Sequence, residues 1–256
     1  MPGTRTEKSD VVRSPGSRGA AFLHWSISIL TIGAAGGGLL LTLLANATGK
    51  NEPPPIVRIA CVGDSLTASG YPDVLQRMLG DRAEVANLAV DGARASDPSS
   101  DNRSIKVQRL TFTSSRTSHR RFSVSVDHAL QTFKPDVIVV LLGSNNARED
   151  YDISNFESDY LATLAWLRRA APGASVVVAL PPTVDQMNGC KIRRSILLES
   201  VRPTIERIAR QEHLRAIDFD VLTAVTDTAD GVHPSESGRA KFASLVYDYV
   251  RTTRQW

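Results

Sequence analysis

Cysteine is scarce in this chain: its 256 residues include only Cys61 and Cys190. Two cysteines cannot build a disulfide framework, and these two are not spaced as the ligands of a metal ion are. Cys61 lies within an apolar run, where we interpret it as a small buried side chain. The sequence leaves open only whether a single bridge joins the two cysteines.

A large excess of either charge is also missing. The formal net charge is +3 and the pI is near 9.0. No basic patch is interleaved with aromatic residues, so nucleic acid is not favoured as a partner. Hydrophobic residues make up 42% of the chain and charged residues 22%, which is typical of a globular protein with a sizeable core. The length suffices for one large domain and an appendage.

Charged residues are absent over one long stretch, between Arg18 and Lys50. Its apolar part is long enough for a helix that crosses a bilayer, which needs about 20 residues, and it exceeds the apolar region of a cleaved signal peptide. We therefore predict an uncleaved transmembrane signal anchor at 20–47. The Ala-Asn-Ala sequence at its end has the form of a cleavage site, and cleavage would instead give a secreted protein. More Arg and Lys residues precede the span than closely follow it, so the tail 1–19 should be cytosolic and disordered, with the main domain lumenal or extracellular.

A proline-rich linker at 48–55 precedes a domain at 56–256 in which strand and helix patterns alternate. This alternation predicts a three-layer α/β/α fold with a five-stranded parallel sheet. The predicted strands cover 56–62, 83–88, 136–143, 174–180 and 214–219. The predicted helices cover 71–79, 124–133, 156–171, 192–211 and 235–251. Pro203 should kink or divide the fourth helix. Residues 96–121 should form a long loop with a possible strand at 105–112.

Five residues that could carry chemistry follow predicted strands, at the edge where a parallel sheet places its ligands. Ser65 follows the first strand, Gly92 the second, Asn145 the third, and Asp230 and His233 the fifth. A serine hydroxyl needs a base that takes its proton, and an imidazole, neutral near pH 7, can be that base. The aspartate can orient the imidazole and stabilise its protonated form. The backbone N–H groups of Ser65 and Gly92 and the Asn145 amide could bind a developing oxyanion.

Each of these residues alone has a plainer interpretation. Ser65 could simply begin a helix, Gly92 could be a turn glycine, and Asn145 could be an ordinary loop residue. Asp230 and His233 could belong to a turn that leads into a helix. Their joint occurrence in this order, each after a strand, favours a functional site.

With these residues in place, the sequence resembles the SGNH (GDSL-type) hydrolase superfamily over nearly the whole predicted domain. The motifs that carry the resemblance are 63–66 (Gly-Asp-Ser-Leu), Gly92, 143–145 (Gly-Ser-Asn) and 230–234 (Asp-Gly-Val-His-Pro). It implies a flavodoxin-like sheet and a serine esterase that needs neither metal nor cofactor. It also implies Ser65 as nucleophile, an Asp230–His233 pair, and oxyanion donors on Ser65, Gly92 and Asn145. The G-x-S-x-G elbow of α/β-hydrolases is absent.

Asn146 departs from the pattern of this superfamily. The third motif usually reads Gly-x-Asn-Asp, and Asn146 stands in the place of the aspartate. The oxyanion asparagine is kept, but the loop lacks the support that a carboxylate would give. We expect activity to persist, at an unchanged or reduced level. The later segments 181–183, 201–203 and 217–218 are similar to members that deacetylate carbohydrates.

We therefore expect an esterase that removes short acyl groups, acetyl above all, from a small-molecule or glycan ester. A lysophospholipase or thioesterase, acting at the membrane that the N-terminal helix would reach, is one alternative. An O-acyltransferase that uses the same residues is another. A binding module without catalysis is disfavoured by the intact set of Ser65, Asp230 and His233.

Overall fold

The structure is a computed structural model that describes residues 55–254, except 98, 100, 113–121 and 184–190. The predicted tail and membrane span therefore lie outside the described residues and stay predictions. Within the described ranges, no helix is both long and apolar enough to cross a membrane.

Five parallel strands form one sheet, in the order β2-β1-β5-β6-β7. Their bounds are β1 (Val57–Gly63), β2 (Ala83–Ala89), β5 (Val137–Leu141), β6 (Ser175–Leu180) and β7 (Arg215–Asp218). The predicted five-stranded parallel sheet is confirmed, and its order is the flavodoxin-like one. The central strands β1 and β5 are buried almost throughout, because helices cover both faces of the sheet.

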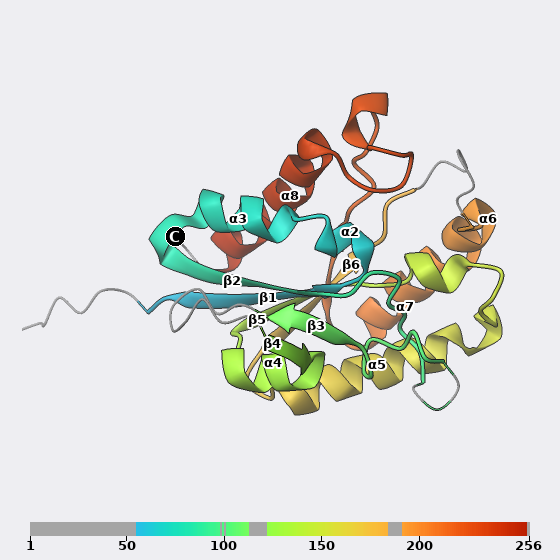
Figure 1. The fold of residues 1–256 in the computed structure, drawn as a ribbon, viewed down its shortest axis with the longest axis horizontal. Helices are drawn as coiled ribbons and strands as arrows, with labels where there is room; N and C mark the ends of the chain where they lie inside the picture. Colours follow the sequence, from blue (N-terminus) through green and yellow to red (C-terminus); the bar gives the residue numbers. More distant parts are fainter. Residues whose placement is uncertain (1–54, 98, 100, 113–121, 184–190, 255–256) are drawn as a thin grey trace, which may run out of the picture. The chain divides into compact units, whose positions relative to one another are not determined.

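Helices form the two outer layers (Figure 1). One face carries α3 (Tyr71–Leu79) and α8 (Glu236–Arg254), and the other carries α4 (Val126–Phe133), α5 (Phe156–Ala170) and α7 (Arg202–Gln211). The bounds of α3 are as predicted, and those of α5 differ by one residue, because apolar residues at helical spacing mark both helices clearly.

Three aromatic rings fix α3 and α8 to the end of β7. The Phe219 ring stacks on Phe242 with centroids 4.6 Å apart, and the Tyr71 ring meets both at 5.6 and 6.0 Å. All three side chains are fully buried. Each aromatic pair of this kind contributes about 0.5–1.5 kcal/mol beyond its burial. The chain beyond β7 therefore starts from a fixed position.

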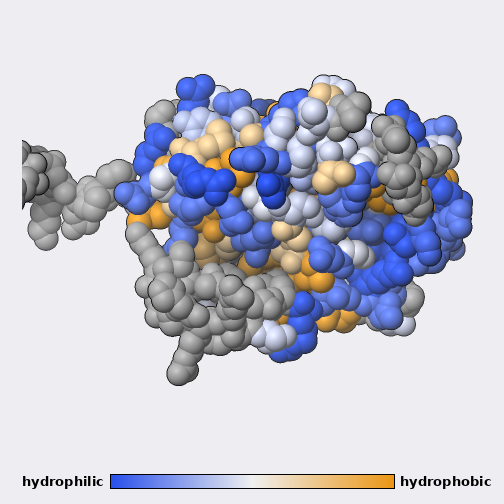
Figure 2. Space-filling view, turned by 45° about the horizontal axis from the view of Figure 1, so that its top comes forward, coloured by the Kyte–Doolittle hydropathy of each residue, from blue (hydrophilic) through white to orange (hydrophobic). Residues whose placement is uncertain are grey.

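The surface is mostly hydrophilic on the face shown in Figure 2, where apolar residues form small separate groups. Among the described residues, the large apolar side chains that are exposed are Met78, Val107 and Leu198, from three different segments. Cys61 lies in β1 as a free, fully buried thiol, and burial raises its pKa to about 12. It is therefore an inert core side chain, as the sequence indicates.

The predicted start of one helix is wrong. The strand β4 (Phe122–Ser125), which pairs antiparallel with β3 (Arg109–Phe112), occupies the first part of the predicted helix 124–133. The helix α4 begins only at Val126, since the Ser125 hydroxyl accepts a hydrogen bond from the His128 N–H at 3.2 Å and caps the helix there. The strand β3 is also shorter than the strand considered for this region.

The helical segment that contains Pro203 is continuous but includes a π-helical turn, which the sequence did not specify. A short helix α6 (Arg194–Ile196) continues through a π-helical turn (Leu197–Val201) directly into α7. Proline lacks an N–H, and its ring clashes with the carbonyl one turn earlier in a regular helix. The wider π turn before α7 shifts that carbonyl, so Pro203 fits within the first turn of α7.

Arg202 joins the three segments 181–183, 201–203 and 217–218. Its guanidinium donates to both carboxylate oxygens of Asp218, at 2.9 and 3.0 Å, and to the Pro181 carbonyl at 2.5 Å. The start of α7 is thereby tied to the ends of β6 and β7, beside the edge where ligands bind in such sheets.

Gly143 gives a test of this packing, because its φ is +127° and an added Cβ would lie 2.8 Å from Val201 Cγ1. We predict that Gly143→Ala lowers the free energy of unfolding by about 1–3 kcal/mol, since backbone and packing both oppose a side chain. Urea denaturation measures the change. Gly173→Ala is the matched control: its Cβ would meet nothing within 4 Å. Equal losses in both variants would contradict the prediction.

Candidate active site

The carboxyl ends of the strands bring the five predicted site residues together. Ser65 follows β1, Gly92 follows β2, Asn145 follows β5, and Asp230 and His233 follow β7. All five line one cavity of about 810 Å³. The parallel sheet accounts for this convergence, because its strands end at a common edge.

A tight turn fixes the position of Ser65, the first residue of α2 (Ser65–Ala68). The Asp64 carboxylate accepts a hydrogen bond from the Leu66 N–H at 3.0 Å and caps this short helix. A Cβ on Gly63 would lie 2.7 Å from the Leu141 carbonyl, so only glycine allows the turn to approach β5 this closely. The hydroxyl of Ser65 is thus held at the strand end by groups on both sides.

Ser65, His233 and Asp230 form a hydrogen-bonded series. His233 Nε2 lies 3.0 Å from Ser65 Oγ, and Nδ1 lies 2.7 Å from Asp230 Oδ2. Asp230 Oδ1 also accepts from the backbone N–H groups of Val232 and His233, at 3.0 and 2.7 Å. Burial alone would raise the pKa of Asp230, but the hydrogen bonds from the His233 ring and from these backbone groups lower it to about 2. An ionised Asp230 favours the proton on Nδ1, which leaves Nε2 to accept from the Ser65 hydroxyl.

Asp227 fixes the loop that carries Asp230 and His233. Its carboxylate is 1% exposed and accepts hydrogen bonds from Lys241 Nζ at 2.6 Å and from the Ala224 N–H at 2.8 Å. The hydrogen bond from Lys241, followed by that from Ala224, lowers the pKa of Asp227 to about 2. Because Lys241 belongs to α8, this contact ties the loop to a core helix.

The three predicted oxyanion donors also line the cavity. Among the described residues, the backbone N–H groups of Ser65 and Gly92 have no hydrogen-bond acceptor. The Asn145 amide nitrogen already lies 3.2 Å from Asp64 Oδ2 and 3.2 Å from the Ala93 carbonyl. An oxyanion would therefore share one of the Asn145 hydrogens, and both bonds are at the long end of the usual range.

Asp64 is a site residue that the sequence marks only as a member of the 63–66 motif. Its carboxyl is fully buried behind Ser65 and bonds to the Asn145 amide. Burial raises the pKa of Asp64 to about 7, against the opposing effects of the Leu66 N–H, His233 and Asn145. Its contact with Asn145 connects two loops and depends on the fold, so sequence could not reveal it.

Arg148 and Lys191 also line the cavity, and neither belongs to a motif that carries the family resemblance. Arg148 follows Asn145 by three residues at the same sheet edge, and this proximity was a usable signal. Lys191 lies in the long connection after β6, and nothing in its sequence context predicts its position. An isolated antiparallel bridge between Arg148 and Ile192 brings the two segments together.

A model of the GDSL-like lipase/acylhydrolase family matches residues 61–241. The chain belongs to this family. The resemblance to SGNH (GDSL-type) hydrolases is thereby confirmed.

This GDSL-type protein is 26% identical over 232 residues to an acetylxylan esterase of Xylanibacter ruminicola. The match covers 77% of the chain but 44% of that relative, so the chain spans less than half of the relative's length. A carbohydrate acetylesterase family member from Sinorhizobium meliloti shares the fold with a TM-score of 0.55 and 18% identity, over 78% of this chain and 100% of that one. An aryl esterase of M. smegmatis has a TM-score of 0.54 at 17% identity, over 77% of this chain and 99% of that one.

The low pKa of Asp227 predicts a pH dependence of stability. The folded value of about 2 lies below the ordinary 3.8, so the stabilisation is present above about pH 4 and is lost as the pH falls toward 2. We predict that Asp227→Asn lowers the free energy of unfolding near neutral pH, and that variant and wild type converge in acid. Urea denaturation at a series of pH values measures this difference. A difference that stays constant down to the acid limit would contradict it.

Proposed function

We propose that this protein is a serine esterase that removes short acyl groups, most simply acetyl, from a carbohydrate. The observation that carries the proposal is the 3.0 Å contact of His233 Nε2 with Ser65 Oγ, continued to Asp230 at 2.7 Å. A base within hydrogen-bond reach of a hydroxyl, itself oriented by a carboxylate, is the arrangement that activates a serine.

In the first half-reaction, Ser65 Oγ attacks the ester carbonyl carbon while His233 Nε2 takes the hydroxyl proton. The carbonyl electron pair moves onto oxygen, and the N–H groups of Ser65 and Gly92, with the Asn145 amide, hold this oxyanion. When the carbonyl reforms, the bond to the sugar oxygen breaks and His233 returns the proton to that oxygen. The ionised Asp230 stabilises the imidazolium that exists between the two transfers.

In the second half-reaction, water attacks the acyl group on Ser65 and His233 takes a proton from that water. The same donors hold the second oxyanion. The bond between Ser65 Oγ and the acyl carbon then breaks, Oγ regains its proton from His233, and the carboxylic acid leaves.

The lining of the cavity supports a small acyl group on a hydroxyl-rich acceptor. Charged side chains of Asp91, Arg148 and Lys191 can hydrogen-bond sugar hydroxyls beside the site. The apolar side chains on the lining are few and small to medium in size; they are Leu66, Ala68, Ile192 and Val232. The acetylxylan esterase and the carbohydrate acetylesterase among the similar proteins support the same substrate class.

The role of Ser65 gives the direct test of this function. We predict that Ser65→Ala lowers kcat on p-nitrophenyl acetate by about 1,000-fold or more, because no nucleophile replaces the hydroxyl. Stability should change little. Ser244→Ala, which removes an exposed hydroxyl on α8, is the matched control and should keep the wild-type rate. Equal rates for wild type and Ser65→Ala would refute the enzymatic role of this site.

The substrate class is tested with the same proteins on esters of increasing acyl length and on acetylated xylan or acetylated sugars. Release of acetate from the sugars, with rates that fall as the acyl chain lengthens, is the expected result. Rates that rise with chain length would instead favour a lysophospholipase or thioesterase. Transfer of acetyl to a sugar acceptor in excess of hydrolysis would favour an acyltransferase.

A further inference from the structure

We infer that Arg94 and Asn146 are positioning residues that hold the loop after β2 against the loop after β5. Gly92 lies on the first loop and Asn145 on the second, so these contacts set the separation of two proposed oxyanion donors. The inference rests on the proposed function, in which these donors act together. Neither Arg94 nor Asn146 lines the cavity, so neither can touch the substrate directly.

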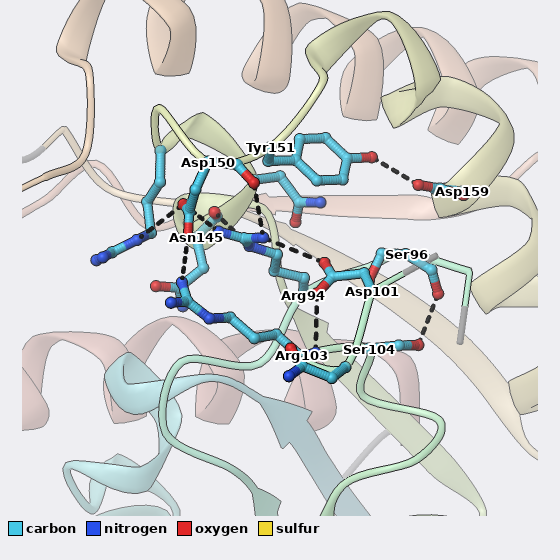
Figure 3. A network of polar contacts seen from close by, with 12 residues as sticks. Arg94, Ser96, Asp101, Arg103, Ser104, Asn145, Asp150, Tyr151 and Asp159 are labelled. Atoms are coloured by element: carbon cyan, nitrogen blue, oxygen red, sulfur yellow. Dashed lines mark hydrogen bonds and ion pairs between the residues drawn. The ribbon is translucent and has the colours of Figure 1, made fainter. Parts of the chain in front are cut away.

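Arg94 is a buried cation whose guanidinium is bonded on every edge (Figure 3). Its side chain is 3% exposed, and Nε donates to the Asn145 backbone carbonyl at 2.9 Å. The two terminal nitrogens donate to Asp101 at 3.2 Å and to Asp150 at 2.5 Å. The flat face lies over the Tyr151 ring, 5.5 Å from its centroid. Only the planar fork of arginine can meet all these partners at once.

Stability alone does not account for a buried charge at this place. Removing a guanidinium and its carboxylate partners from water costs on the order of several kcal/mol. Proteins in which apolar side chains replace such buried ion pairs are often as stable as the original. An apolar side chain at position 94 could not donate a hydrogen bond to the Asn145 carbonyl, as Arg94 does. Arg94 lies only two positions after Gly92, so this bond links the loops of two proposed oxyanion donors. We therefore assign Arg94 a geometric role between the two loops.

Asn146 makes a reciprocal pair with the backbone of Ala95. Its Oδ1 accepts from the Ala95 N–H at 3.2 Å, and its Nδ2 donates to the Ala95 carbonyl at 2.8 Å. The Asn145 amide bonds to the Ala93 carbonyl at 3.2 Å. Three consecutive residues of one loop are thus each bonded to Asn145 or Asn146, which prevents the loops from sliding past each other.

The reciprocal pair explains why asparagine suits a position where the family usually has aspartate. Asn146 is fully buried. An ionised aspartate there could accept from the Ala95 N–H, but its second oxygen would face the Ala95 carbonyl with no proton between them. A buried carboxylate oxygen that has no donor and faces a carbonyl oxygen is costly. In this chain, Asn146 therefore stabilises the loop after β5 through its two hydrogen bonds to the Ala95 backbone.

The test compares Asn146→Asp and Arg94→Met with wild type on p-nitrophenyl acetate. We expect kcat to fall about 10-fold or more, since the oxyanion donors are displaced, with KM within about twofold. In Asn146→Asp, protonation restores a donor to the Ala95 carbonyl, so the ratio of variant to wild-type kcat should rise as the pH is lowered. Arg94→Lys keeps the charge without the fork and should give an intermediate kcat.

Two matched controls make the same chemical changes at exposed positions, away from the two loops. Arg168→Met removes an arginine from an exposed ion pair with Glu212, 2.7 Å apart. Asn155→Asp makes the same amide-to-carboxyl change at an exposed position. Both should keep the wild-type kcat.

The outcomes distinguish this inference from the proposed function, because Ser65→Ala is assayed beside the other variants. If wild type is active and Ser65→Ala is not, a wild-type kcat in folded Asn146→Asp and Arg94→Lys overturns the inference alone. If these variants are less stable in urea but keep the wild-type kcat, the two residues act only on stability and the inference is also overturned. Should Arg94→Met not fold, these two variants carry the test. A wild type inactive on every ester overturns the proposed function and the inference with it.

Discussion

The contact between His233 and Ser65 depends on a parallel sheet whose strands end at one edge. The two residues are 168 positions apart in sequence, and their reacting atoms lie 3.0 Å apart. Each side of the contact has its own support. The Gly63–Asp64 turn fixes Ser65 against β5, and the Asp227–Lys241 ion pair fixes the His233 loop against α8. The chemistry proposed for the site needs both supports, since proton transfer requires the two atoms to stay within hydrogen-bond reach.

Buried polar groups surround the site more densely than the rest of the core. The side chains of Asp64, Arg94, Asn145 and Asn146 are nearly or fully buried. Hydrogen bonds from these residues connect the segments that follow β1, β2 and β5. Such networks specify one arrangement because a shifted loop would leave several buried groups without partners. This explains how a site built on the short segments that follow the strands can keep fixed donor positions. Preorganised donors of this kind are what stabilises charge in an acyl-transfer transition state.

Much of the fold and of the site follows from the sequence, for physical reasons that can be named. Short apolar β-branched runs such as β5 are typical of buried strands, and alternation with helices indicates a parallel sheet, which places Ser65 and His233 at one edge. The rest depends on tertiary contacts. The Ser125 cap outweighs a helical pattern that runs through it. Arg94 precedes a loop rich in charged and hydroxyl side chains, whose composition is that of a solvated surface, and only the folded structure reveals its buried guanidinium.

The proposed chemistry depends on activation of Ser65 by His233. Incubation with a fluorophosphonate, which forms a covalent bond to an activated serine with loss of fluoride, followed by peptide mass spectrometry, tests it most directly. We predict a single adduct on the peptide that contains Ser65, formed far more slowly in His233→Ala. An unlabelled Ser65 in folded wild-type protein, or equal labelling rates with and without His233, would contradict it.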